Sequence, residues 1–125
     1  MTDRELLELA AKAAGYRVHG WINDKLYVIN GPNPAEYYDP FSWNPLSDDG
    51  DALRLAVKLN IRIEPNFSDG SHFIFAGIDN PNHAPELVWE SEYEWLAEEI
   101  SQEDPMGATR RAIVRAAVEI GKRRA

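Results

Sequence analysis

The chain has 125 residues and a formal net charge of −8, with 44% hydrophobic and 27% charged residues, which is typical of a single globular domain over residues 1–125. It has no cysteine, which excludes disulfides, thiolate catalysis and the common cysteine-based zinc sites. The negative charge opposes binding to nucleic acid and to anionic membranes. No stretch approaches the roughly 18 apolar residues of a membrane span, so we expect a cytoplasmic protein.

The first segment predicts a helix over residues 2–15. Thr2 and Glu5 have the spacing of a capping box, in which each side chain accepts a hydrogen bond from an unpaired backbone amide of the first turn. Apolar residues then recur at helical spacing. Gly15 is suited to end the helix because glycine adopts the left-handed conformation freely.

The next segment predicts a β-hairpin with strands at 16–22 and 25–30. Apolar and polar residues alternate along the first strand, and Asn23-Asp24 occupies the tight turn. His19 falls on the more polar face. We interpret it as a half-exposed strand histidine, since no partner can be named that would make it a general base.

Residues 31–45 predict a long loop because four prolines interrupt it. The loop nevertheless holds four aromatic residues, which form the candidate partner-binding set: Tyr37, Tyr38, Phe41 and Trp43. They would offer an aromatic contact surface to a partner or planar ligand. The alternative is that the rings close the end of the core, because rings this dense are costly to leave in water.

A second helix is predicted from Ser47 or Asp48 to about Leu59, with Asn60 ending it. Leu53, Ala56 and Val57 are predicted to face inward, widened by Leu55 and Leu59. The helix begins with three aspartates, at Asp48, Asp49 and Asp51. One hypothesis is a metal site or small enzyme that uses these acids with His72 or His83. The alternative is that the acids complement the positive end of the helix dipole, since the EF-hand register is absent.

A strand at 61–65 and a stronger strand at 72–78 follow. Both faces of the second strand are apolar, which is typical of a central strand covered on each side. His72 at its start is expected to be a satisfied histidine at the edge of the core. Residues 87–89 predict another short strand, and helical spacing after a second capping box predicts a helix over 91–101.

Asp104-Pro105 is a specific start signal for a last helix, on which Arg111, Arg115 and Lys122 share one face. These three cations are the candidate anion-binding residues. Residues 86–104 contain eight acids and no Lys or Arg. The acidic segment is therefore expected to compensate the basic stripe, and nucleic-acid binding, the third functional hypothesis, is unfavoured because phosphate contacts need uncompensated bases.

Three segments of this chain together resemble the phage ABA sandwich domain, a family of small phage and prophage proteins related to NinX-type proteins. They are residues 5–15, residues 43–59 beginning Trp-Asn-Pro-Leu, and Asp104-Pro105 with residues 109–117. The resemblance implies an α/β/α sandwich and a bacterial host cytoplasm. It implies no established activity, cofactor or catalytic residue.

We therefore expect an α+β domain: a three-layer α/β/α sandwich whose mainly antiparallel sheet has about four or five strands, with helices on both faces. No dinucleotide, P-loop, hydrolase or di-iron motif occurs, so we predict no catalytic residue, no cofactor and no metal. The leading hypothesis is a non-enzymatic phage accessory protein that binds a host or phage protein. A second copy of the chain is a further candidate partner.

Overall fold

The computed structural model describes residues 1–31, 36, 38–66, 73–79, 93–99 and 104–124. Within these ranges the helices are α1 (Asp3–Ala13), α2 (Asp49–Leu59) and α3 (Pro105–Arg124). One antiparallel sheet has the order β1 (Arg17–Ile22), β2 (Lys25–Ile29), β3 (Phe41–Ser42). A second antiparallel sheet has the order β4 (Arg62–Asn66), β5 (Phe73–Asp79), β6 (Tyr93–Glu99). None of the helices described is long and apolar enough to cross a membrane.

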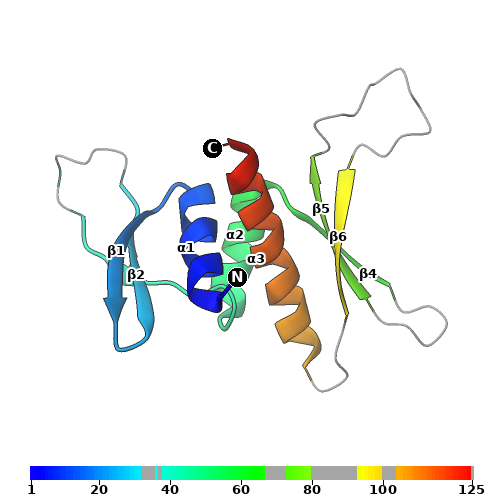
Figure 1. Ribbon diagram of the computed structural model, residues 1–125, viewed down its shortest axis with the longest axis horizontal. Coiled ribbons are helices and arrows are strands. Elements are labelled where there is room, and N and C mark those ends of the chain that lie inside the picture. Colours follow the sequence, from blue (N-terminus) through cyan, green and yellow to red (C-terminus); the bar gives the residue numbers. More distant parts are fainter. Residues whose placement is uncertain (32–35, 37, 67–72, 80–92, 100–103, 125) are drawn as a thin grey trace.

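The three helices lie between the two sheets (Figure 1). α3 contacts α1, α2, β5 and β6, and α1 contacts β1 and β2. The predicted α+β class and antiparallel pairing are thus confirmed. The predicted single sheet of four or five strands is instead two sheets, and the layer order of an α/β/α sandwich is not seen in the described ranges. Strand patterns specify which residues extend but not which strands pair, because pairing depends on contacts between distant segments.

The core is formed by apolar side chains from all three helices and from both sheets. α3 contributes the largest share, with Ala112, Ile113, Val114, Ala116, Ala117 and Val118 all buried. Leu26 and Val28 of β2 enter from one sheet, and Ile74, Ala76 and Ile78 of β5 enter from the other. β5 is the middle strand of its sheet, as predicted. The helical layer therefore joins two sheets that have no strand in common.

The ends of the helices form as the sequence predicts. The Thr2 side chain accepts a hydrogen bond from the Glu5 amide at 3.2 Å, and Asp48 accepts one from the Asp51 amide at 2.8 Å. Asn60 ends α2 with φ of 55°. Asp104 accepts a hydrogen bond from the amide three residues ahead, at 2.9 Å. Each signal acts within one turn, so it does not depend on the rest of the fold.

The first hairpin also forms as predicted, with positive φ at Asn23 and Asp24. His19 is exposed, as expected, and occupies an irregularity in the pairing between Val18 and Gly20. Trp21 of β1 donates from Nε1 to Glu8 of α1 at 2.9 Å. This bond fixes the sheet against the first helix.

The helix predicted over residues 91–101 is wrong, because Tyr93–Glu99 form strand β6. This strand pairs with β5 over its whole length, and Phe75 lies opposite Ala97. Leucine, alanine and glutamate favour a helix locally, but hydrogen bonding to the edge of β5 outweighs that preference. The strand predicted at residues 87–89 lies outside the described residues.

Candidate functional site

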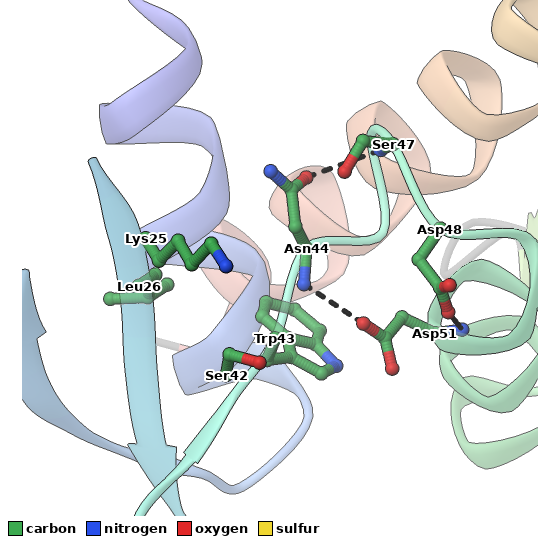
Figure 2. A pocket seen from close by; sticks show the side chains of 8 residues that line it. All are labelled: Lys25, Leu26, Ser42, Trp43, Asn44, Ser47, Asp48 and Asp51. Carbon is green, nitrogen blue, oxygen red and sulfur yellow. Dashed lines mark hydrogen bonds between the residues drawn. The ribbon is translucent and has the colours of Figure 1, made fainter. Parts of the chain in front are cut away.

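A pocket of about 300 Å³ lies where β2, β3 and the start of α2 meet. It is lined by Lys25, Leu26, Ser42, Trp43, Asn44, Ser47, Asp48 and Asp51. Figure 2 shows the indole of Trp43 between β2 and α2, beside the carboxylate of Asp51. The pocket thus joins one predicted aromatic residue with two of the three predicted aspartates.

The turn before α2 is held by hydrogen bonds that use the polar groups of this pocket. The Asn44 side chain accepts hydrogen bonds from the amides of Leu46 and Ser47, at 3.0 and 3.2 Å. The Asn44 amide donates to Asp51 Oδ2 at 2.9 Å (Figure 2). Asp51 therefore connects the loop before α2 to the first turn of the helix. This hydrogen bond also positions Trp43, which directly precedes Asn44.

The three aspartates each have a partner of opposite charge or a backbone donor. Arg54 lies 2.7 Å from Asp51 and 3.9 Å from Asp48. Asp49 lies 2.6 Å from Arg110 of α3, whose Nε also donates to the Leu46 carbonyl at 2.9 Å. The hydrogen bond to Asp51 raises the pKa of the Arg54 guanidinium above its ordinary value. Arg54 therefore offsets part of the negative charge of Asp48 and Asp51.

These contacts favour the interpretation of the aspartates as a helix start. Within the part of the chain that the structure describes, no group of three or more His, Asp or Glu side chains is arranged to hold a metal ion. The hypothesis of a metal-dependent enzyme also needs His72 or His83, and both lie outside the described residues. No described contact favours that hypothesis over a cap that complements the helix dipole.

Replacing Asp51 should measurably destabilise the fold. Asp51→Ala removes the acceptor of the partly buried Asn44 amide, and an unsatisfied buried donor costs about 1–3 kcal/mol. We expect the free energy of unfolding, measured by urea denaturation, to fall by that amount. Asp24→Ala, which removes an exposed ion pair with Arg4, is the matched control and should change it by about 0–1 kcal/mol. Equal losses in the two variants would contradict a structural role for Asp51.

The four predicted aromatic residues do not form one surface. Trp43 is only 3% exposed and belongs to the core, so it closes the end of the core. Phe41 is 40% exposed, and its ring meets Tyr16 edge-on with 5.8 Å between centroids. Tyr38 is half-buried and donates to Glu36 at 2.8 Å. Tyr37 lies outside the described residues, so Phe41 is the ring most accessible to a partner in the described part of this loop.

An exposed apolar pair on α2 was not predicted from the sequence. Leu53 and Val57 are 64% and 74% exposed, although they were predicted to face inward. The buried residues of this helix are Ala52, Leu55 and Ala56. At 100° per residue these three positions and Leu59 lie within about 100° of one another, which is a full core-facing stripe. The six apolar positions of α2 exceed the width of one such stripe, so the sequence could have shown that some of them must lie outside the core, but not which ones.

Two cations lie beside that pair. Arg54 and Lys58 follow Leu53 and Val57 by one position each, and the Lys58 ammonium lies 4.4 Å from the centre of the Tyr16 ring. Tyr16 also meets the Trp43 ring edge-on at 5.5 Å. We call Leu53, Arg54, Val57 and Lys58 the α2 face. It combines two exposed apolar side chains with two cations. Lys58 connects this face to Tyr16, whose ring contacts Phe41.

The three predicted anion-binding residues separate into two groups. Arg111 lies 3.4 Å from Asp3 of α1 and is partly neutralised by it. Arg115 and Lys122 both line a second pocket, between α1 and the last turns of α3. Of the acidic segment expected to compensate them, the structure describes only residues 93–99 and 104, so this compensation stays a prediction. The basic stripe therefore contributes an ion pair at one end and a pocket at the other.

Comparison of the chain with protein-family models, with curated proteins and with solved structures found no match.

Proposed function

We propose that this chain is a phage or prophage accessory protein that acts without catalysis, by binding another protein through the α2 face. The observation that carries the proposal is the exposure of Leu53 and Val57 one helical turn apart. Single exposed apolar residues are ordinary on protein surfaces. Two adjacent aliphatic side chains on a helix whose opposite side is fully packed form a continuous apolar stripe that a partner can cover.

The energy available supports a contact centred on this pair. Burying one leucine or valine side chain contributes about 1.5–3 kcal/mol. Interfaces concentrate their binding energy in a few central residues surrounded by a polar border. On the α2 face, Arg54 and Lys58 supply such a border, and Lys58 contacts the Tyr16 ring, which in turn meets the half-exposed Phe41 of β3.

The charges indicate the chemistry of the partner. The chain is acidic overall, with a net charge of −8, whereas the α2 face is bordered by Lys58 and by Arg54, whose guanidinium also pairs with Asp51 and Asp48. A partner that presents an apolar stripe flanked by Asp or Glu would match both features, and complementary charge would speed and orient the encounter. An amphipathic acidic helix fits this description, because its apolar residues also recur one turn apart.

The family resemblance supplies only the phage or prophage origin in this proposal, since it implies no activity. The segments that carry it correspond to α1, to the Trp43 turn with α2, and to α3, which are the helices of the central layer (Figure 1). The resemblance also implies one sheet between helical layers. A single sheet would give nuclear Overhauser contacts between backbone atoms of β1 or β2 and backbone atoms of β4, β5 or β6. Two separate sheets, as in the structure, would give none of these contacts.

Affinity capture with matched variants tests the binding proposal. Tagged protein expressed in phage-infected cells should retain a partner that mass spectrometry identifies. Leu53→Asp with Val57→Asp should lower the recovered partner at least about tenfold, since losing even 1.4 kcal/mol of binding energy weakens affinity that much. The two replacements face solvent, so the folded state should persist, which circular dichroism checks.

The control removes two exposed apolar residues from other elements. Ile22→Asp on β1 with Met106→Asp on α3 changes the charge equally and also replaces two exposed apolar side chains, but leaves the α2 face intact. This variant should retain the partner. If the α2 variant recovered as much partner as the unaltered protein, or if both double variants lowered recovery equally, the result would count against binding through the α2 face.

A further inference from the structure

The second pocket, of about 230 Å³, lies where the beginning of α1 meets the C-terminal half of α3. It is lined by Met1, Leu6, Arg115, Val118, Glu119 and Lys122, and we call it the α1–α3 pocket. The two helices run side by side in the same direction (Figure 1), as the contacts from Asp3 to Arg111 and from Ala13 to Gly121 require. Leu6, Arg115, Val118 and Glu119 lie between those two contacts along the helices, and Met1 and Lys122 lie just beyond them.

The lining has an apolar part and a cationic part. Leu6 and Val118 are buried core residues, so they present hydrocarbon at the base of the pocket. Arg115 and Lys122 are exposed and lie seven residues apart, two helical turns, on one face of α3. Their long side chains have apolar stems and cationic tips, and the tips can approach a group held between them.

The charge balance at this end of α3 favours an anion. The C-terminal half of α3, residues 115–124, contains four basic residues and one acid, Glu119, in a protein that is acidic overall. Glu119 also lines the pocket, but Arg123 lies 3.5 Å from its carboxylate and offsets it. An arginine guanidinium has five N–H donors, so Arg115 can hold a carboxylate while keeping another contact.

We propose that the α1–α3 pocket binds a small organic anion with an apolar tail. Arg115 and Lys122 would hold the carboxylate, and the tail would lie on Leu6 and Val118. The volume corresponds to that of about eight water molecules, which suits a ligand of comparable heavy-atom number such as a six-carbon carboxylate. This site is separate from the α2 face and does not depend on the proposed protein partner.

Titration of ¹⁵N-labelled protein with hexanoate tests the proposal. Amide shifts should move saturably at Leu6, Arg115, Val118 and Lys122, with a dissociation constant on the order of 1 mM for so small a ligand. Hexylammonium and 1-hexanol, which have the same tail, should not saturate these shifts. Acetate should bind at least about tenfold more weakly, because each buried methylene adds affinity.

Paired variants separate the pocket from general electrostatics. Arg115→Gln with Lys122→Gln should weaken hexanoate binding at least about tenfold, through loss of two charge-assisted hydrogen bonds. Arg54→Gln with Lys58→Gln removes the same amount of charge from the α2 face and should leave the affinity for hexanoate unchanged. Equal binding of 1-hexanol or acetate, equal weakening by both pairs, or shifts centred elsewhere would each overturn the proposal.

Discussion

Replacing Trp43 with alanine should lower the free energy of unfolding by about 3–5 kcal/mol, the usual cost of removing a large aromatic ring from a core. The indole is 3% exposed and packs with Tyr16 against the core cluster. The backbone amide of Trp43 donates to the Leu26 carbonyl at 2.9 Å, which places the residue beside β2. The cavity left by the missing indole would therefore open between β2 and α2 (Figure 2). Urea denaturation of the purified protein measures the change.

Phe41→Ala is the control for this result. Phe41 comes from the same loop and meets the same Tyr16 ring, but it is 40% exposed. We expect a loss of about 1 kcal/mol or less, because little apolar surface is buried there and only one edge-on contact is lost. If Trp43→Ala cost no more than Phe41→Ala, Trp43 would belong to an open contact surface.

Leu55→Ala should cost about 2–5 kcal/mol, the range found for leucine in packed cores. Leu55 is 2% exposed and is one of the largest fully buried side chains of the described part of the chain. Small domains are stable by only about 5–15 kcal/mol, so this variant should have a strongly lowered melting temperature. Differential scanning calorimetry or thermal circular dichroism would measure it.

The matched control is the same substitution two residues earlier on the same helix. Leu53 is exposed, so Leu53→Ala should change stability by no more than about 0.5 kcal/mol. The pair therefore reports the rotation of α2 about its axis. If Leu53→Ala lowered stability strongly and Leu55→Ala lowered it little, Leu53 would face the core, as the sequence pattern predicted.

Features set within one turn of the chain could be predicted from the sequence. Thr2, Asp48 and Asn60 cap helices at the predicted positions, and Asn23-Asp24 turns the first hairpin. In each case a side chain or a left-handed residue satisfies its own neighbours. Such signals do not depend on which distant segments later come together.

Features set by distant contacts could not be predicted. Residues 93–99 form a strand because β5 offers them an unpaired edge, and no local pattern reveals that edge. The division into two sheets has the same cause. The rotation of α2 about its axis was predicted less well than its ends, since its six apolar positions exceed one core-facing stripe and only packing decides which two remain outside.

The candidate sites were predicted only in part, for the same reason. Aromatic residues in a loop can cover the core or face a partner, and the sequence left both open for Phe41 and Trp43. The structure buries Trp43 in the core and leaves Phe41 partly exposed. Arg115 and Lys122 were predicted as neighbours on one helical face, but the apolar floor beneath them comes from Leu6, more than 100 residues earlier.

The position of α3 at the centre of the fold has a consequence for synthesis of the protein on the ribosome. A nascent chain that lacks residues 105–124 leaves α1 with only its contacts to β1 and β2 and leaves β5 without its cover by α3. Such a chain exposes hydrophobic surface that attracts chaperones or other nascent chains. Cooperative folding must therefore wait until this last helix has left the exit tunnel, however early the first helix and hairpin form.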